Sequence, residues 1–123
     1  MFRDQGRAFS SDGYARCVSK KMIEKGWDLR IPEPERQFCY MPLNHSECLS
    51  DQDRCVRLMK ARLSNSGSEK LVHAKAHREV IRRFGRFPTR NAVLERPSTS
   101  EEARFLNDEG GYGGVVNVMR AAS

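Results

Sequence analysis

A glycine and a proline three residues apart, Gly85 and Pro88, constrain this chain more than any other feature. Just before them, Val80, Ile81 and Phe84 have the spacing of side chains that share one face of a helix. A glycine at the next position can adopt the left-handed conformation that ends a helix, and a proline cannot continue one. The sequence therefore predicts that a helix ends at Gly85 and that an ordered turn follows it.

The predicted turn covers residues 86–96 and leads into a further helix. The stretch PSTSEEARFL offers two possible capping boxes, Ser98 with Glu101 or Thr99 with Glu102. Either box would satisfy free backbone amides at the first turn of that helix.

Arginine is concentrated in this part of the chain. Six arginines lie between residues 78 and 96, and only two acidic residues, Glu79 and Glu95, lie among them. One interpretation is a solvated face laced with salt bridges, with Phe84 and Phe87 in the core, because most runs of charge are of this kind.

Two other interpretations of the arginines remain open. Arginines on a fixed turn could form an anion pocket, because the guanidinium fork binds carboxylate or phosphate through two hydrogen bonds. Alternatively, Arg86 or Arg90 could be buried against Glu47 and hold the fold together rather than a ligand.

Glu47 belongs to a second polar segment, His45-Ser46-Glu47, which lies between two predicted helices. A histidine and a glutamate two residues apart could act as an acid/base pair or hold a polar ligand. In the alternative, His45 and Ser46 cap the neighbouring backbone and Glu47 pairs with an arginine. Ser46 has no glycine elbow and no evident triad order, so no nucleophile is indicated and the catalytic residues are unknown.

A metal site is not expected. Zinc needs four ligands in tetrahedral reach, and the four cysteines include no CxxC pair. His45 and Cys48 are three apart, and His73 and His77 are four apart, but Cys55 has the spacing of a helix core residue. We expect neither a metal nor a cofactor.

The composition limits the possible partners and locations. The net charge of +6 is spread over several predicted helices without a nucleic-acid recognition motif, so we expect no nucleic-acid partner. No apolar run approaches the roughly 20 residues that span a bilayer. Polar, charged sequence follows Met1 in place of a secretory signal, so we expect a cytoplasmic protein.

The chain is short enough for one domain. Helical patterns run at about residues 10–25, 35–41, 50–63, 69–84 and 100–107. Each helix has one apolar face, so antiparallel pairs stacked on one another are the natural all-α arrangement. We expect a single helical domain over residues 1–109 and, because of the glycines at its start, a mobile tail over residues 110–123.

Two blocks of this sequence resemble a known family. RFGRFPTRNAVLERPSTSEEARFL is similar to RFGRFPHRNxxLGRxSTxEExxFL, a signature of the domain-of-unknown-function 924 family. RQFCYMPLNHSECLSDQDRCVRLM is similar to that family's RxFFYLPLMHSEDLxxQxxxVxL. The resemblance implies a tetratricopeptide-like α-superhelix with no established activity, and it implies that the leading helices of the family domain are missing here.

The chain departs from the family pattern at four places. Thr89 stands for a histidine, Glu95 for a glycine, Cys48 for an aspartate and Asn44 for a methionine. Chemistry that rests on a histidine in the turn is therefore not expected.

The resemblance also places a candidate ligand site along the matched positions. The candidate residues are His45, Glu47, His77, Arg83, Arg86, Arg90 and Asn91. We expect a non-catalytic module that binds a protein or peptide; the alternative is an enzyme or sensor for a small anionic ligand. Side chains that converge on an accessible cavity would favour the small ligand, and side chains that satisfy one another would favour the protein-binding module.

Overall fold

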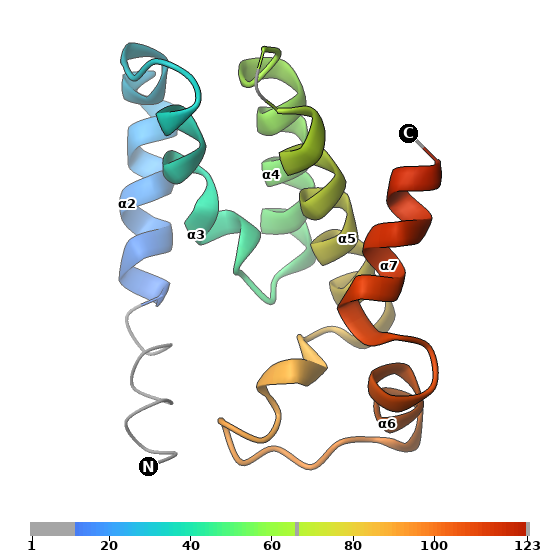
Figure 1. The fold of residues 1–123 in the computed structure, drawn as a ribbon. Helices are drawn as coiled ribbons and strands as arrows, with labels where there is room; N and C mark the ends of the chain where they lie inside the picture. Colours follow the sequence, from blue (N-terminus) through green and yellow to red (C-terminus); the bar gives the residue numbers. More distant parts are fainter. Residues whose placement is uncertain (1–11, 66, 123) are drawn as a thin grey trace.

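The computed structural model describes residues 12–65 and 67–122, and all regular structure in these ranges is helical (Figure 1). The α-helices are α2 (Asp12–Glu24), α3 (Met41–Asn44), α4 (Leu49–Arg62), α5 (Ser68–Phe84), α6 (Ser100–Asn107) and α7 (Gly111–Ala121). Three short 3₁₀ helices join them, η1 (Trp27–Arg30), η2 (Glu35–Cys39) and η3 (Pro88–Arg90). The predicted all-α class is confirmed. None of the described helices has the length and apolar character needed to cross a bilayer.

Helix α5 lies at the centre of the packing. It runs antiparallel to α4, which precedes it, and packs against α7 on another side (Figure 1). Helices α2 and α3 pack together, and α3 also contacts α4. The predicted antiparallel pairing is therefore present in α4 and α5, whereas the superhelix of the family remains a prediction.

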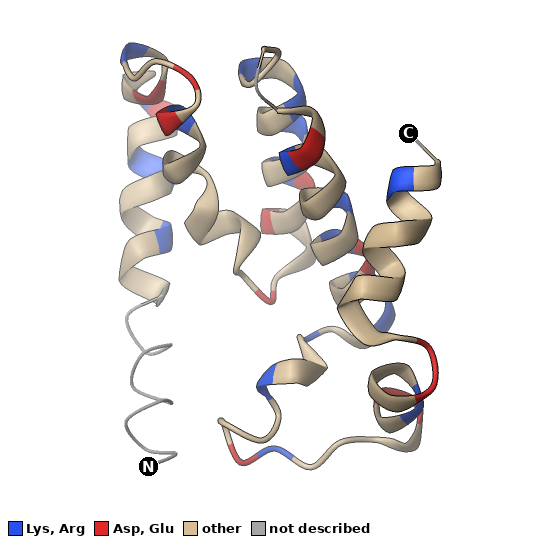
Figure 2. Ribbon diagram, viewed as in Figure 1, with Lys and Arg blue, Asp and Glu red and all other residues tan. Residues whose placement is uncertain are grey.

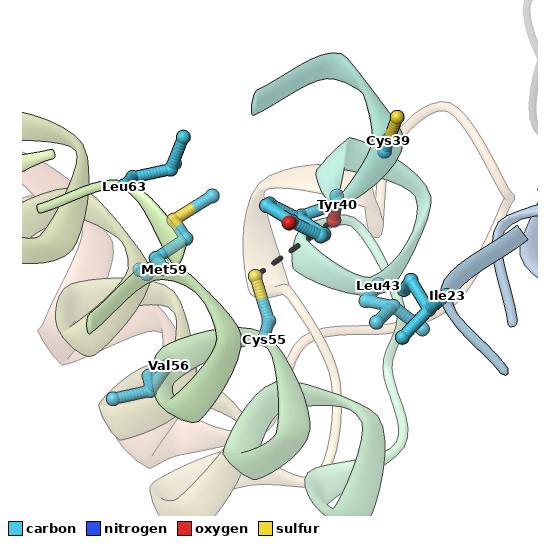
Figure 3. Packing of buried hydrophobic residues seen from close by; sticks show 9 residues of the cluster. Ile23, Cys39, Tyr40, Leu43, Cys55, Val56, Met59 and Leu63 are labelled. Carbon is cyan, nitrogen blue, oxygen red and sulfur yellow. Dashed lines mark hydrogen bonds between the residues drawn. The ribbon is translucent and has the colours of Figure 1, made fainter. Parts of the chain in front are cut away.

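The core has two parts. One lies between α2, α3 and α4, where Tyr40, Leu43, Cys55 and Met59 are buried almost completely (Figure 3). The Cys55 thiol points at the Tyr40 carbonyl oxygen, 3.8 Å away. The core position predicted for Cys55 is confirmed. The second part lies between α5, α6 and α7.

A buried polar network ties η1 to the first core. The carboxylate of Asp28 is fully buried and accepts hydrogen bonds from the Tyr40 hydroxyl at 2.5 Å and the Arg62 guanidinium at 2.7 Å. Burial alone would raise the pKa of Asp28, but these two donors lower it below its ordinary value. Asp28 is therefore held as a carboxylate in the interior.

The helix expected at residues 35–41 is divided in two. Helix η2 ends at Cys39, and α3 begins at Met41 with Pro42 in its first turn. Proline is tolerated there because the first amides of a helix have no partner within it. Pro42 thus lies in the first turn of a separate short helix.

The boundaries predicted around the turn agree with the structure. Gly85 has φ of 70° and caps the C-terminus of α5. Of the two possible capping boxes, the structure contains Thr99 with Glu102 at the start of α6.

We predicted a mobile tail from residue 110, and the structure has a helix there instead. Residues 111–121 form α7, in which Val115 and Val116 are buried against α5. Glycines weaken a helix, but this apolar face gains more from tertiary packing than the glycines cost. Gly110 has φ of 78°, and a Cβ on Gly114 would lie 2.4 Å from the Glu109 carbonyl oxygen. The glycines make the tight corner between α6 and α7.

Glu95 has φ of 56°, the one positive φ among the non-glycine residues in the described part of the chain. A side chain in this left-handed region costs roughly 1–2 kcal/mol. The family pattern has glycine at this position, and a glycine here would relieve the backbone strain that Glu95 carries.

Replacing Tyr40 with phenylalanine should lower the free energy of unfolding by about 1–3 kcal/mol, because the buried Asp28 carboxylate loses a donor. Urea denaturation measures the effect. Tyr14→Phe is the matched control, since the Tyr14 side chain is 78% exposed. Equal stability of the two variants would contradict the role given to Tyr40.

Replacing Glu95 with glycine should raise the free energy of unfolding by up to about 1 kcal/mol, since relief of strain exceeds the entropy cost of glycine. The control is Ala92→Gly in the same turn, where φ is not positive and glycine should cost about 0.5–1 kcal/mol. The strain at Glu95 is refuted if both variants lose stability to the same extent.

Candidate functional site

Two segments far apart in sequence meet beside the N-terminus of α4 and the C-terminus of α5. They are the histidine strip, residues 44–48, and the arginine turn, residues 86–96. The carboxylate of Glu47 joins them. It accepts the backbone N–H of Phe87 at 2.6 Å and pairs with the guanidinium of Arg96 at 2.9 and 3.2 Å. Burial would raise the pKa of Glu47, but Arg96 and the Phe87 amide lower it below its ordinary value. Glu47 therefore holds the fold together as a carboxylate.

Arg86 is fully engaged with the start of α6. Its guanidinium donates two hydrogen bonds to the buried Glu102 carboxylate, at 2.6 and 2.7 Å, and one to the Pro97 carbonyl oxygen at 2.8 Å. Arg86, followed by the Thr99 amide, lowers the pKa of Glu102 to about 2. The same carboxylate closes the capping box, so Arg86 fixes the direction in which α6 begins.

An arginine of the turn does pair internally with Glu47, as one interpretation of the sequence predicts. The partner is Arg96, however, and neither Arg86 nor Arg90; Arg86 pairs with Glu102. The pairing depends on how far the turn folds back, which the local sequence does not determine.

Asn91 and Arg83 also have structural partners. Asn91 is buried, donates to the Ser98 hydroxyl at 3.0 Å and accepts from Arg96 at 3.2 Å. Arg83 pairs with Glu109 at 3.2 Å, and its guanidinium carbon lies 5.1 Å from the centre of the Phe105 ring. Arg83 lines a separate hollow between α5 and α7.

Three of the seven candidate residues, His45, His77 and Arg90, converge on one cavity. The cavity has a volume of about 240 Å³. It is lined by His45, His77, Val80, Phe87, Pro88, Thr89, Arg90, Phe105 and Tyr112. We call it the ring cavity, because aromatic and imidazole rings form much of its wall.

Arg90 holds the edge of the ring cavity in place. Its guanidinium carbon lies 4.7 Å from the centre of the Phe87 ring, and its Nη2 donates to the His45 carbonyl oxygen at 2.9 Å. The stacking and the hydrogen bond give the guanidinium a defined position. Arg90 is the one permanently charged side chain among the described residues that line the cavity.

His77 forms the inner wall of the ring cavity. Its Nδ1 lies 2.7 Å from the Asn44 Oδ1 atom, and its ring centre lies 4.8 Å from that of Tyr112 and 5.4 Å from that of Phe87. Burial, reinforced by the nearby His45 and His73, lowers the pKa of His77 to about 4. His77 is therefore neutral at physiological pH.

Sequence reasoning missed several walls of the ring cavity. Tyr112 comes from α7, where we expected no structure, and Phe105 comes from the apolar face of α6. The apolar run Val115, Val116, Val118 and Met119 was the available signal for α7, since its spacing fits one helical face.

In the described part of the chain, basic and acidic residues share the same elements. Figure 2 shows both lysine or arginine and aspartate or glutamate on α2, α4, α5 and the arginine turn. Within residues 12–65 and 67–122, no three His, Cys, Asp or Glu side chains are placed to hold a metal ion.

Comparison with known proteins identifies the family. The family model described as "Bacterial protein of unknown function (DUF924)" matches residues 1–110, so the chain belongs to this family. The chain is similar to a solved structure, the protein of unknown function ATU0120 from Agrobacterium tumefaciens, with 36% identity and a TM-score of 0.74. That match covers 81% of this chain and 55% of the other, so this chain spans little more than half the length of its neighbour. No curated protein matches the chain.

The Arg86–Glu102 pair predicts a dependence of stability on pH. The pKa of Glu102 is about 2 in the folded chain and near its ordinary value of 4.5 when unfolded. The unfolded chain therefore binds the proton first, and the contribution of Glu102 is lost as the pH falls from about 4.5 toward 2. Glu102→Gln keeps a capping residue and should cost about 1–2 kcal/mol at neutral pH.

Urea denaturation of the wild type and of Glu102→Gln between pH 7 and pH 2.5 measures this contribution. The stability gap should stay constant above about pH 5 and shrink below pH 4.5. Glu101→Gln, a change at an exposed neighbour, is the control and should give no such gap. A gap that does not change with pH would refute the ion pair as its source.

Proposed function

We propose that this member of the DUF924 family binds, in the ring cavity, a small ligand that has a planar apolar body and one anionic group. The observation that carries the proposal is the Arg90 guanidinium, fixed at the edge of a wall made mostly of rings. Ligand cavities in proteins are mostly apolar, with a few placed polar groups that orient the ligand.

The lining of the cavity supports a planar apolar body. Phe87, Phe105 and Tyr112 contribute aromatic rings to its wall, and Val80 and Pro88 add apolar residues. A volume of about 240 Å³ is just below the roughly 300–1,000 Å³ of sites for drug-sized molecules. A single substituted ring is of the right scale.

The charge of the cavity supports an anionic group. Glu47, the carboxylate beside the turn, is already paired with Arg96, and Glu102 is paired with Arg86. Neutral His77 adds no charge of its own. Arg90 brings a guanidinium to the edge of the cavity, and a guanidinium suits a carboxylate or a phosphate.

The geometry supports binding rather than a particular reaction. The carboxylate of Glu47, a candidate acid or base, accepts hydrogen bonds from Arg96 and the Phe87 amide. The Ser46 hydroxyl donates to the Asp51 carboxylate at 2.7 Å and does not line the cavity. Neither residue is placed to act on a ligand there.

A protein or peptide partner is a second candidate function, supported by exposed apolar side chains on the opposite part of the molecule. Tyr14 and Val18 on α2 are 78% and 40% exposed, and Phe38 on η2 is 67% exposed. Stacked helical hairpins such as α4 with α5 are the units from which tetratricopeptide-like arrays build binding surfaces. We also propose a cytoplasmic location, which the free cysteines support.

The test is titration calorimetry with benzoate, phenyl phosphate and the neutral analogue benzyl alcohol. Benzoate or phenyl phosphate should bind measurably tighter than benzyl alcohol. Arg90→Gln should weaken anion binding at least about tenfold, since it removes a charge-assisted contact. Arg82→Gln carries the same charge change at a helix position outside the cavity and should bind as the wild type does.

Two results would reject the proposal. One is the absence of binding by any of the three compounds. The other is equal loss of affinity in Arg90→Gln and Arg82→Gln, because general charge would then account for the effect.

A further inference from the structure

His77 and Tyr112 form a wall shared by two cavities. One is the ring cavity, and the other is a second cavity of about 360 Å³. Asn44 and His73 line the second cavity, and they do not line the ring cavity. The two ring nitrogens of His77 therefore have different surroundings.

The partner of Nδ1 fixes where the proton of neutral His77 resides. An amide oxygen accepts hydrogen bonds and cannot donate one, so the Asn44 Oδ1 atom requires a proton on Nδ1. A neutral imidazole carries only one such proton. Nε2 is then left with a lone pair, and it is an acceptor.

The direction of Nε2 follows from the place of Asn44. Nδ1 faces Asn44, which lines only the second cavity, whereas His77 also lines the ring cavity beside Phe87, Tyr112 and His45. The edge of the imidazole that carries Nε2 is therefore the part of His77 that a ligand of the ring cavity can meet. Within the described part of the chain, no group donates a hydrogen bond to Nε2, and Asn44 is the partner of Nδ1. A half-buried acceptor of this kind selects for a ligand that brings its own donor.

We propose that the ligand of the ring cavity carries a hydroxyl or N–H group that donates to His77 Nε2, in addition to the anionic group at Arg90. This inference rests on the proposed function and narrows its ligand class to ring acids with a second, donating substituent. Hydroxylated aromatic acids and N–H-bearing heteroaromatic acids belong to this class.

Two other roles for His77 fit the geometry less well. A proton relay to the second cavity would need a group that can take the proton from Nδ1, and the amide of Asn44 cannot. A cationic His77 that holds the anion itself would need a proton on Nε2, which burial and the neighbouring Arg90 disfavour. The acceptor role needs no change in protonation.

The selectivity should be large enough to measure. A ligand without a donor displaces water from His77 Nε2 and leaves this nitrogen without a hydrogen bond. A methoxy group places its oxygen, an acceptor, opposite Nε2, which is also an acceptor. Sites built around such a hydrogen bond discriminate strongly against analogues that lack it. At the net value of one hydrogen bond, a hydroxyl in the right position should improve affinity about threefold to tenfold.

The experiment compares benzoate with the 2-, 3- and 4-hydroxybenzoates and the corresponding methoxybenzoates by titration calorimetry. The three isomers cover different separations between the carboxylate at Arg90 and the donor at His77. We expect at least one hydroxybenzoate to bind tighter than both benzoate and its own methoxy analogue.

Three variants assign the preference to Nε2. His77→Phe should bind hydroxybenzoate and benzoate equally. His73→Phe, the same change one turn earlier on α5, removes an imidazole that lines only the second cavity and contacts the Tyr112 hydroxyl at 2.7 Å, and it should keep the preference. Asn44→Asp places a carboxylate beside Nδ1, which favours the protonated ring and turns Nε2 into a donor, so the preference for a hydroxyl should vanish.

Each outcome decides between the inference and the proposed function. If benzoates bind and lose affinity in Arg90→Gln, but hydroxyl and methoxy forms bind equally to the wild type, the inference is overturned and the proposed function stands. If no benzoate binds, the proposed function fails first. If His77→Phe does not fold, the hydroxyl and methoxy affinities of the wild type and of Asn44→Asp still decide the question.

Discussion

The structure depends on the carboxylate of Glu47. It accepts from the backbone of Phe87, 40 residues away, and from the side chain of Arg96, 49 residues away. These contacts fix the histidine strip against the arginine turn, and the ring cavity lies where the two meet. Arg90, which belongs to the arginine turn, lies at the edge of that cavity. A single half-buried ion pair of this kind adds little stability in general, but here it sets the relative position of two segments.

Local signals in the sequence predicted local features. The glycine at position 85 ends α5, and Thr99 with Glu102 begins α6, because both are determined by backbone groups within one turn. The partners of the arginines were not predictable in this way. Whether Glu47 meets Arg86 or Arg96 depends on the path of the whole turn. Tyr112 was missed because its local sequence is misleading. Its glycine neighbours have poor helix propensity, and packing of α7 on α5 overcomes this poor propensity.

The departures from the family pattern acquire physical meaning in the structure. Two of them concern the cavities: Thr89 lines the ring cavity, and Asn44 lines the second cavity, where its Oδ1 atom is the partner of His77 Nδ1. The other two lie at backbone positions. Glu95 occupies a left-handed conformation, and Cys48 stands at the N-cap of α4 without a side-chain cap, a place that suits the aspartate of the pattern. This chain therefore differs from its family both in the chemistry of the cavity and in the quality of its turns.

The wall shared by the two cavities has a consequence for how this molecule can change. His77 is fixed in the wall by Asn44, whereas Tyr112 enters from α7, beyond the residues that match the family model. A small side chain at position 112 would join the two spaces into one elongated chamber. Substitutions in the C-terminal helix alone would thus enlarge the space at this wall, while the family signature stayed intact.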